Sequence, residues 1–423
     1  MTRWFDDERD WFQSARYGLF LHWGVYAVPA WHEQIQYRQG LSRPEYEPFV
    51  QQFNPVEFDP DRWLDIAEAS GMRYLTFTTK HIDGFCMWDS ALTEYKITNT
   101  PYGRDTLAML AEACQRRNFP LCLYYSFVDH NHPNYPNEGR AHELSGPQPG
   151  DEPDVARYVD YVKGQIRELC TKYGKIHGIW WDAQRLGIED ASLNDMIREL
   201  QPAAMINDRG LSPGDITVYE RDYSKTVYDI PAFATATEAC QAIGLQSWGF
   251  REDEDYYTTK YMIQSIDRMM AKGANYLLNV GPDALGRIAP NEEAMLRRIG
   301  DWYQRVKESF DAEAVPGMTD NRQVLTSQRG KTVYVHLQEV TGNALVLHPI
   351  RQLPERVTLL NDGREMEACL SRLPVYHKDS EPCLRIPRLP VEEMEGEVMV
   401  LRLDFADEIG QPGTDGYEHR DLG

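Results

Sequence analysis

The chain has 423 residues, of which 42% are hydrophobic, so it is long enough to bury at least one large core and is not a disordered protein. Its 44 Lys and Arg residues stand against 66 Asp and Glu residues, which gives a formal net charge of -22 at pH 7. A field of that sign repels nucleic acid and anionic membranes, so a neutral small molecule or glycan is the better expected ligand.

The N-terminal residues, MTRWFDDERDWF, are acidic and lack the apolar core of a secretory signal. No stretch approaches the roughly 20 apolar residues of a membrane span. The seven cysteines are scattered, odd in number and without a C-x-x-C pair, which favours reduced thiols over disulfides or a zinc ribbon. These features predict a cytoplasmic protein.

Short apolar runs alternate with amphipathic helical stretches through the first three quarters of the chain. We expect eight strands, at 17–21, 74–79, 121–126, 178–182, 204–207, 215–220, 246–250 and 276–281. Helices are expected at 62–69, 105–118, 155–173, 193–200, 258–271 and 291–309. This α/β alternation in about 310 residues favours a (β/α)8-like barrel over an open doubly wound sheet, and no G-x-G-x-x-G motif follows an early strand.

Beyond residue 312 the pattern changes to short strands separated by Gly, Pro and Asn. They are expected at 331–337, 344–348, 356–360, 383–386 and 398–404. Because no helical pattern separates them, they predict a small antiparallel β-sandwich. We therefore expect a catalytic barrel over residues 1–312, a β-sandwich over 313–407 and a polar tail over 408–423.

Polar side chains gather at the carboxyl ends of the predicted barrel strands, where the active sites of such barrels lie. The first six strands end, in chain order, in His22-Trp23, Lys80-His81-Ile82-Asp83, Tyr124-Tyr125-Ser126, Trp180-Trp181-Asp182, Asn207-Asp208-Arg209 and Tyr219-Glu220. One such residue alone is often structural. Six consecutive strand ends on one rim predict a functional site.

Two carboxylates define the expected chemistry. Asp182 follows an apolar and aromatic run, and Glu220 comes two strands later, across the expected barrel mouth. Paired carboxylates, with Trp and Tyr faces for a sugar ring and His or Arg for its hydroxyls, are what glycoside hydrolysis needs. One carboxylate must stay ionised and the other protonated, so their environments must differ.

A metal site is the competing interpretation. His130 and His132, in the loop after the third strand, are candidate ligands together with His22 and His81. The first two lie beyond the strand end in a loop rich in Pro and Asn, and the strand ends offer more Trp and Tyr than ligands. We therefore expect no metal.

Eight ordered segments span residues from about 10 to about 305, namely RYGLFLHWGVYAVPAWHE, TTKHIDGFCMWDS, YKITNTPYGRD, LYYS, GIWWD, INDR, SWGF and ANYLLNVGPDALG. In this order they resemble the successive motifs of the α-L-fucosidases of glycoside hydrolase family 29. The resemblance implies a (β/α)8-like barrel and hydrolysis with retention through a covalent fucosyl-enzyme. It implies no metal and no organic cofactor, and a small carbohydrate as the partner.

The resemblance also implies roles for individual residues. It places the nucleophile at Asp182, which closes the W-x-D motif, and the acid/base at Glu220, which follows the N-D-R motif. Acid/base placement varies among relatives, so Glu238 is the alternative. Positions that hold the sugar or shape its pocket fall on His22, Trp23, Glu33, His81, Tyr125, Trp180, Arg209 and Trp248.

The segment TTKHIDGFCMWDS is expected to form one wall of the site. His81 would reach the sugar, while Asp83 would orient its neighbours. Phe85 and Trp88 suit the wall of the pocket and the core equally well.

Two positions depart from the family pattern. The family usually reads K-H-H where this chain has Lys80-His81-Ile82, and E-W where it has Glu33-Gln34. A site that recognises a hydroxyl loses discrimination when a donor is removed. The expected sugar is therefore α-L-fucose or a close relative such as α-L-galactose.

The sequence thus predicts a retaining, exo-acting glycoside hydrolase that releases α-L-fucose or a fucose-like sugar from short oligosaccharides or glycoconjugates. The alternative is a catalytically silent glycan-binding protein on the same barrel, for which Ile82 and Gln34 are the best support. The presence of both Asp182 and Glu220 argues against it, because binding alone needs neither. Whether the chain forms a homo-oligomer is left open.

Overall fold

The computed structural model describes residues 4–221, 229–319, 321, 323–340, 342–348, 350–372 and 382–410. Residues 411–423, most of the predicted tail, lie outside this part. Within the described residues, no helix combines the length and the apolar character needed to cross a membrane.

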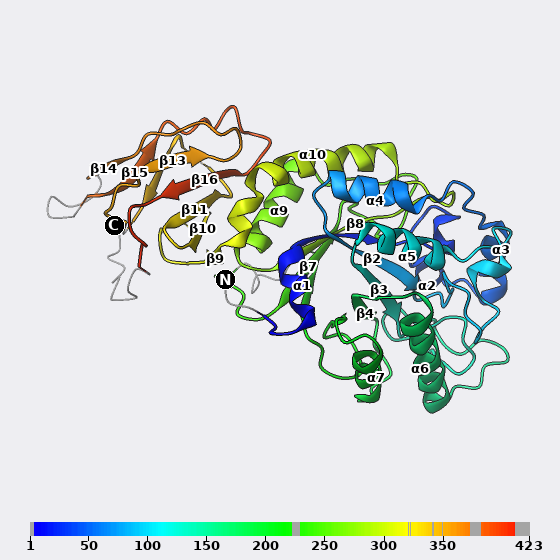
Figure 1. The fold of residues 1–423 in the computed structure, drawn as a ribbon. Coiled ribbons are helices and arrows are strands. Elements are labelled where there is room, and N and C mark those ends of the chain that lie inside the picture. Colours follow the sequence, from blue (N-terminus) through cyan, green and yellow to red (C-terminus); the bar gives the residue numbers. More distant parts are fainter. Residues whose placement is uncertain are drawn as a thin grey trace.

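Eight parallel strands curl into a barrel, which Figure 1 shows beside a smaller all-β region. Their order in the sheet is β5-β4-β3-β2-β1-β8-β7-β6, and a parallel bridge between Asn207 and Ile216 joins the two edges. The strands are β1 (Tyr17–Leu21), β2 (Tyr74–Lys80), β3 (Leu121–Ser126), β4 (Gly178–Asp182), β5 (Met205–Ile206), β6 (Thr217–Glu220), β7 (Thr237–Ala242) and β8 (Asn275–Val280). This arrangement confirms the predicted (β/α)8-like fold.

Helices surround the barrel. They are α1 (Trp11–Ala15), α2 (Ile35–Gln39), α3 (Arg43–Gln52), α4 (Pro60–Ala69), α5 (Thr106–Arg117), α6 (Val155–Lys172), α7 (Ser192–Leu200), α9 (Thr259–Ala271) and α10 (Pro290–Val306). Several begin where the sequence has a capping residue: the side chains of Asp59, Asp105 and Asp154 accept hydrogen bonds from backbone N–H groups of the first turns of α4, α5 and α6. Such caps satisfy N–H groups that have no partner inside the helix.

One predicted barrel strand is wrong. The seventh strand is β7, Thr237–Ala242, and residues 246–250 form part of the loop that follows it. β7 reads TEACQA and is buried throughout. A strand buried on both faces shows no alternation, and apart from Thr237 this one has none of the β-branched and aromatic residues that mark strands. The aromatic residues of the loop, SWGF, carry that signal instead.

Alternate residues of the barrel strands face the interior, because side chains of a strand point to opposite sides in turn. Phe20, Tyr124, Trp180 and Cys240 pack with one another in an interior cluster. Their neighbours in sequence, such as Tyr125, pack in the larger core between the sheet and the helices. The phase of this alternation decides which strand residues reach the site.

After α10 the chain forms two antiparallel sheets that pack face to face. Their strands are β9 (Glu313–Ala314), β10 (Val324–Arg329), β11 (Thr332–Leu337), β12 (Ala344–Leu347), β13 (Arg356–Leu359), β14 (Cys369–Ser371), β15 (Cys383–Pro387) and β16 (Met399–Asp404). The first sheet has the order β13-β16-β11-β10-β9 and the second β12-β15-β14. Val335 and Leu401 of one sheet and Leu345 and Ile386 of the other share a core, so the predicted β-sandwich is confirmed.

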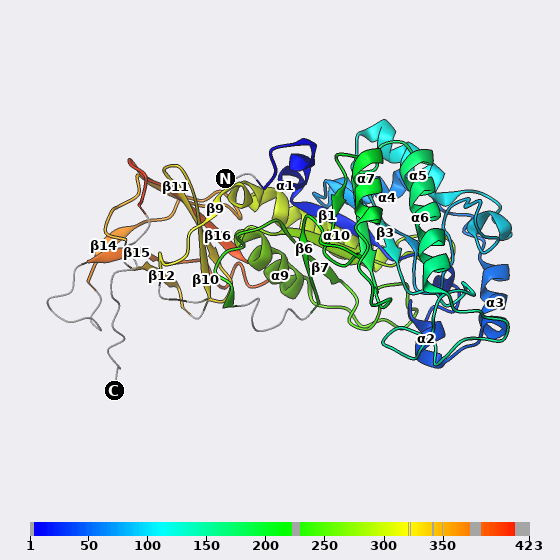
Figure 2. The same cartoon turned by 90° about the horizontal axis from the view of Figure 1, so that it is seen from below.

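Helices α9 and α10 join the barrel to the sandwich, and Figure 2 shows α9 between β10 and the barrel strands β6 and β7. The indole Nε1 of Trp302 donates to the carbonyl of Val398 at 3.0 Å. Asp267 of α9 lies 2.6 Å from Nδ1 of His336 of β11, and both side chains are fully buried. Polar contacts buried at a junction favour one fixed packing of the two parts.

Candidate active site

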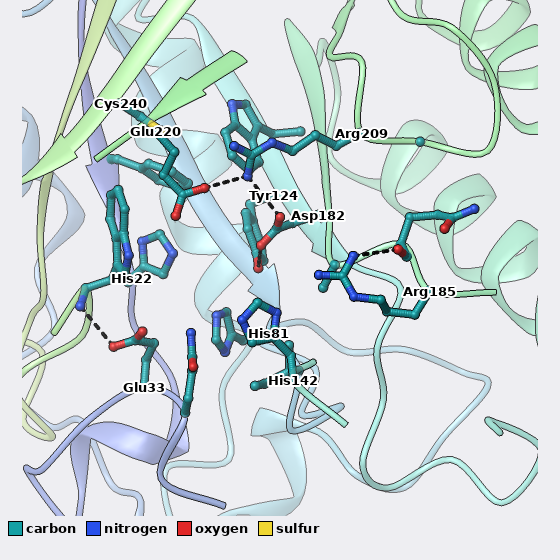
Figure 3. A pocket seen from close by; sticks show the side chains of 18 of the residues that line it. His22, Glu33, His81, Tyr124, His142, Asp182, Arg185, Arg209, Glu220 and Cys240 are labelled. Carbon is teal, nitrogen blue, oxygen red and sulfur yellow. Dashed lines mark hydrogen bonds and ion pairs between the residues drawn. The ribbon is translucent and has the colours of Figure 1, made fainter. Parts of the chain in front are cut away.

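A cavity of about 560 Å³ opens at the carboxyl ends of the barrel strands (Figure 3). This volume is in the range of roughly 300–1,000 Å³ that is usual for ligand pockets. The lining residues come from strand ends and the loops that follow them: Phe20, His22, Glu33, Gln34, His81, Ile82, Tyr124, His142, Trp180, Asp182, Ala183, Gln184, Arg185, Asp208, Arg209, Gly210, Glu220, Cys240 and Trp248.

Arg209 links two carboxylates at this cavity (Figure 3). Its Nη1 lies 3.1 Å from Oδ1 of Asp182 and 2.7 Å from Oε2 of Glu220. Asp182 is the last residue of β4 and Glu220 the last of β6. Because one nitrogen contacts both oxygens, the distance between Oδ1 of Asp182 and Oε2 of Glu220 cannot exceed the sum of these two distances. This geometry admits the separation of roughly 5–5.5 Å between the carboxyl groups of retaining glycosidases.

Asp182 is held as a carboxylate. Burial opposes its ionisation, but the Arg209 guanidinium, together with hydrogen bonds from the Tyr124 hydroxyl and the backbone N–H of Ala183, lowers the pKa of Asp182 below its ordinary value. The Tyr124 hydroxyl donates to Oδ2 at 2.7 Å. The side chain is still 27% exposed, so a ligand in the cavity can reach it.

Aromatic rings form the wall next to the carboxylates. The Tyr124 and Trp180 rings stack with their centroids 5.6 Å apart, and the Phe20 ring lies 5.3 Å from that of Trp180. The central carbon of the Arg209 guanidinium lies 5.0 Å from the centroid of the Trp180 ring. Apolar faces of this kind pack against the C–H groups of a sugar ring.

Glu33 is a buried acceptor aimed at the cavity. Its Oε2 accepts hydrogen bonds from the Ser247 hydroxyl at 2.7 Å and from the Trp248 N–H at 2.9 Å. Its Oε1 is buried and has no partner among the described residues. Burial alone would raise the pKa of Glu33, but the neighbouring His32 and His81 rings and the Ser247 hydroxyl lower it to about 2. A buried carboxylate oxygen without a donor needs one from a ligand.

His22 and His81 are neutral imidazoles at neutral pH. Burial lowers the pKa of His22 to about 4 and that of His81 to about 3. His22 Nδ1 lies 2.7 Å from Oδ1 of Asn279, whose amide nitrogen donates to the Trp248 carbonyl. Nδ1 of His22 therefore carries the proton, and Nε2 is left as an acceptor. His81 Nδ1 is buried and has no partner among the described residues.

Glu238, the alternative acid/base, does not line the cavity. It lies on β7 in the barrel interior and is 1% exposed. Its Oε1 accepts from the Tyr74 hydroxyl at 2.6 Å and its Oε2 from the Trp180 indole at 2.8 Å. Glu238 thus holds the ring that forms the aromatic wall, and both of its oxygens are already in use.

The Glu238 carboxyl makes stability depend on pH. Burial raises its pKa from 4.5 to about 7, so the folded state retains a proton that the unfolded state releases. Stability is therefore lost as pH rises from the unfolded value through about 7, by up to about 3 kcal/mol. We expect Glu238→Gln, which stays neutral and can still accept from Trp180, to gain stability relative to wild type between about pH 5 and about pH 8.

Chemical unfolding at the two pH values measures this effect. The difference in the free energy of unfolding between Glu238→Gln and wild type should grow with pH. Glu199→Gln, an exposed change on α7, is the matched control and should show a constant difference. A Glu238→Gln difference that does not change with pH would contradict the expected protonation.

Two predicted sugar-binding residues lie outside the cavity. Trp23 packs outward in the core between sheet and helices, and its indole donates to the Asp283 carbonyl at 2.8 Å. Tyr125 is fully buried, and its hydroxyl donates to Gln165 of α6 at 2.7 Å. Their inward neighbours, His22 and Tyr124, line the cavity instead. Successive residues of a strand point to opposite faces, so two adjacent residues cannot both face inward.

The segment TTKHIDGFCMWDS divides between cavity and core. His81 and Ile82 line the cavity, whereas Phe85 and Trp88 are buried in the core and do not. Asp83 accepts from the Tyr46 hydroxyl at 2.9 Å, away from the cavity.

A bulge in β2 at this point turns Lys80 away from the site. The register against β3 shifts between Thr78 and Lys80. The Lys80 ammonium is buried and lies 2.8 Å from Asp129, at the start of the next loop. This buried ion pair joins the end of β2 to the loop that follows β3.

The strand-end analysis missed residues that loops bring to the cavity. His142 and Arg185 line it from the loops after β3 and β4. Neither lies at a strand end or in a motif, so no local pattern marks them.

The candidate metal ligands are not arranged as a metal site. His130 Nε2 donates to the His142 carbonyl at 2.7 Å, and the His132 ring lies 4.1 Å from that of Tyr161. Within the described part of the chain, no three His, Cys, Asp or Glu side chains converge as ligands would.

A carboxylate pair beside aromatic rings, at the carboxyl edge of a (β/α)8-like barrel, is the site of a glycoside hydrolase. The comparisons with known proteins specify this class. A family model described as Alpha-L-fucosidase matches residues 5–308. The chain therefore belongs to the α-L-fucosidase family, which confirms the resemblance found in the motifs.

Individual relatives match this protein along most of its length. The tissue alpha-L-fucosidase of Bos taurus is 27% identical, over 85% of this chain and 82% of that protein. The structure of alpha-L-fucosidase isoenzyme 1 from Paenibacillus thiaminolyticus is 30% identical, with a TM-score of 0.84 over 95% of this chain and 99% of that chain. An α-L-fucosidase of family GH29 from Bacteroides thetaiotaomicron, trapped as a covalent intermediate with 2-fluoro-fucosyl fluoride, is 26% identical, with a TM-score of 0.76 over 93% and 94% of the two chains.

Proposed function

We propose that this protein is a retaining, exo-acting α-L-fucosidase that releases α-L-fucose, or a closely related sugar, from short oligosaccharides or glycoconjugates. The observation that carries the proposal is the placement of Asp182. It is ionised between Tyr124 and Arg209, and the same Arg209 nitrogen also contacts Glu220. A covalent intermediate has been trapped in a relative with this fold, as a retaining mechanism requires.

In the first step Asp182 attacks the anomeric carbon of the bound sugar. The bond to the leaving oxygen breaks while Glu220 gives that oxygen a proton, and an ester joins the sugar to Asp182. In the second step Glu220 takes a proton from water, whose oxygen displaces Asp182 from the anomeric carbon. Before the first step the negative charge beside Arg209 is on Asp182. After it Asp182 is an ester and Glu220, having given up its proton, carries the charge, so Arg209 faces one carboxylate in each state.

The other residues of the cavity would bind the sugar. Trp180 offers an apolar face, and Trp248 lines the cavity as well, with its ring 5.2 Å from that of His22. Glu33 Oε1 and His22 Nε2 are acceptors for hydroxyl hydrogens, and the unpartnered His81 Nδ1 offers a third polar atom. Ordered polar atoms aimed at a cavity recognise hydroxyls more selectively than an apolar wall does.

Hydrolysis of nitrophenyl glycosides tests the proposal. The panel is headed by the α-L-fucoside and the α-L-galactoside, and it includes β-L-fucoside and β-D-galactoside as controls of anomer and sugar. We expect turnover of the α-L-fucoside, with the released sugar first appearing as the α-anomer in proton NMR. First appearance of the β-anomer would exclude retention. Binding of fucose without turnover of any α-L-fucoside would favour the silent glycan-binding protein.

We also propose that residues 1–312 and 313–407 are separate domains and that the protein acts in the cytoplasm. The two parts have distinct cores, which supports the boundary. All seven cysteines are free thiols, and six of them are buried, which supports a reducing compartment. Fractionation of cells that make the protein tests the location.

A further inference from the structure

His142 lines the catalytic cavity although no motif marks it. It belongs to the loop between β3 and α6, residues 127–154, and is half-buried. In Figure 3 its ring lies beside His81, on the side of Asp182 and Arg185, while Glu220 lies toward the opposite end of the view. Ile82 lines the same cavity and presents only hydrocarbon to it.

Buried polar contacts fix the part of the loop that carries His142. Glu143, the next residue, is 1% exposed and accepts hydrogen bonds from the Tyr135 hydroxyl at 2.6 Å and from the Arg140 guanidinium at 2.7 Å. The carbonyl of His142 itself accepts from the buried His130 ring at 2.7 Å. These contacts hold the backbone on both sides of the His142 side chain.

The backbone of His142 is strained, with a φ of 72°, in the left-handed region that non-glycine residues rarely adopt. Arg185 reaches across from the loop after β4, and its Nε donates to the Ala141 carbonyl at 3.3 Å. Strained conformations persist where the surrounding structure enforces them, and they concentrate at functional sites.

The His142 imidazole has no hydrogen-bond partner within the described part of the chain. Its one ring contact is an edge contact with Tyr37, at a centroid distance of 5.9 Å. Burial lowers the pKa of His142, so at neutral pH the ring is uncharged, with one nitrogen that donates and one that accepts. A neutral imidazole open to the cavity suits a hydroxyl.

We propose that His142 is a specificity-determining residue that hydrogen-bonds a hydroxyl of the sugar in the cavity, to which Ile82 presents no polar atom. The inference rests on the proposed function and adds a contact to it. The contact is to the sugar rather than to the leaving group, because His142 lies beside His81 and Asp182 and away from Glu220 (Figure 3).

The test uses His142→Asn, because asparagine tolerates the left-handed backbone while removing the imidazole. Glu152→Gln, an exposed change in the same loop, is the matched control. The kcat/KM of each protein is measured with nitrophenyl α-L-fucoside and with its analogues that lack one ring hydroxyl in turn. Titration with free L-fucose and the thermal unfolding temperature accompany the kinetics.

We expect His142→Asn to lower kcat/KM for the parent fucoside by about tenfold, to weaken L-fucose binding and to leave the unfolding temperature unchanged. For the analogue that lacks the contacted hydroxyl, wild type and His142→Asn should have nearly equal kcat/KM. Equal activity on the parent, or the same loss with every analogue, would overturn the inference.

Failure of the proposed function looks different. It would leave wild type inactive on every α-L-fucoside, whereas failure of the His142 inference leaves an active wild type that the substitution does not affect. His142→Ala provides a second variant that removes every hydrogen-bonding atom of the side chain, and it should lose at least as much activity as His142→Asn.

Discussion

Replacing Asp182 with asparagine is expected to lower kcat on nitrophenyl α-L-fucoside by at least about a thousandfold. The amide has nearly the same shape but cannot attack the anomeric carbon as a carboxylate does. Thermal unfolding should be affected far less, because the amide oxygen can still accept a hydrogen bond from Tyr124 or Arg209. Steady-state kinetics beside a melting curve separate loss of chemistry from loss of fold.

Trapping identifies the attacked residue directly. Treatment with 2-fluoro-fucosyl fluoride, the reagent used to trap the Bacteroides relative, should attach one sugar to the wild-type peptide that contains Asp182 and none to Asp182→Asn. Asp208→Asn, a change of another carboxylate that lines the cavity, is the matched control and should still be labelled. A label on any other carboxylate would exclude Asp182 as the nucleophile.

Replacing Glu220 with glutamine is expected to lower kcat by about a hundredfold to ten-thousandfold for substrates with a poor leaving group. The loss in the first step should shrink as the leaving group becomes more acidic, because a good leaving group needs no proton. Dinitrophenyl and methyl α-L-fucosides bracket that range. The decisive measurement is the ratio of variant to wild-type rate across the leaving groups in single-turnover experiments.

Azide provides a second test of the acid/base role of Glu220. Azide attacks the covalent intermediate without a general base, so it should accelerate turnover of Glu220→Gln on the dinitrophenyl substrate and yield a fucosyl azide. The same leaving-group series on Glu238→Gln should show no such trend, since Glu238 lies behind Trp180 and outside the cavity. A leaving-group trend in Glu238→Gln rather than in Glu220→Gln would reverse the assignment.

Much of the barrel could be predicted from the chain because its signals are local. Helices α4, α5 and α6 begin at aspartate caps, and β3 and β4 were predicted with the bounds that the structure has. Strand β7 was not found, because it is buried on both faces and so shows no alternation, while Glu238 and Gln241 interrupt its apolar residues. In the sandwich, β9, β10 and β14 were not predicted, because none of them has a continuous apolar run.

The motifs and their order determined, from the sequence alone, that Asp182, Glu220, Arg209 and His81 would meet, because parallel strands of one barrel end at one edge. Only the tertiary structure decided that Tyr124 rather than Tyr125 faces the cavity, since the register of β3 against its neighbours sets the phase of the alternation.

The tertiary structure also decided the two features that no local pattern encodes. Glu238 lies behind Trp180 because the closed barrel brings β4 and β7 across a shared interior. His142 enters the cavity because contacts between distant residues, such as Lys80 with Asp129, set the path of its loop. Side chains that strands carry follow from short-range periodicity, whereas the path of a long loop depends on contacts between residues far apart in sequence, which local patterns do not contain.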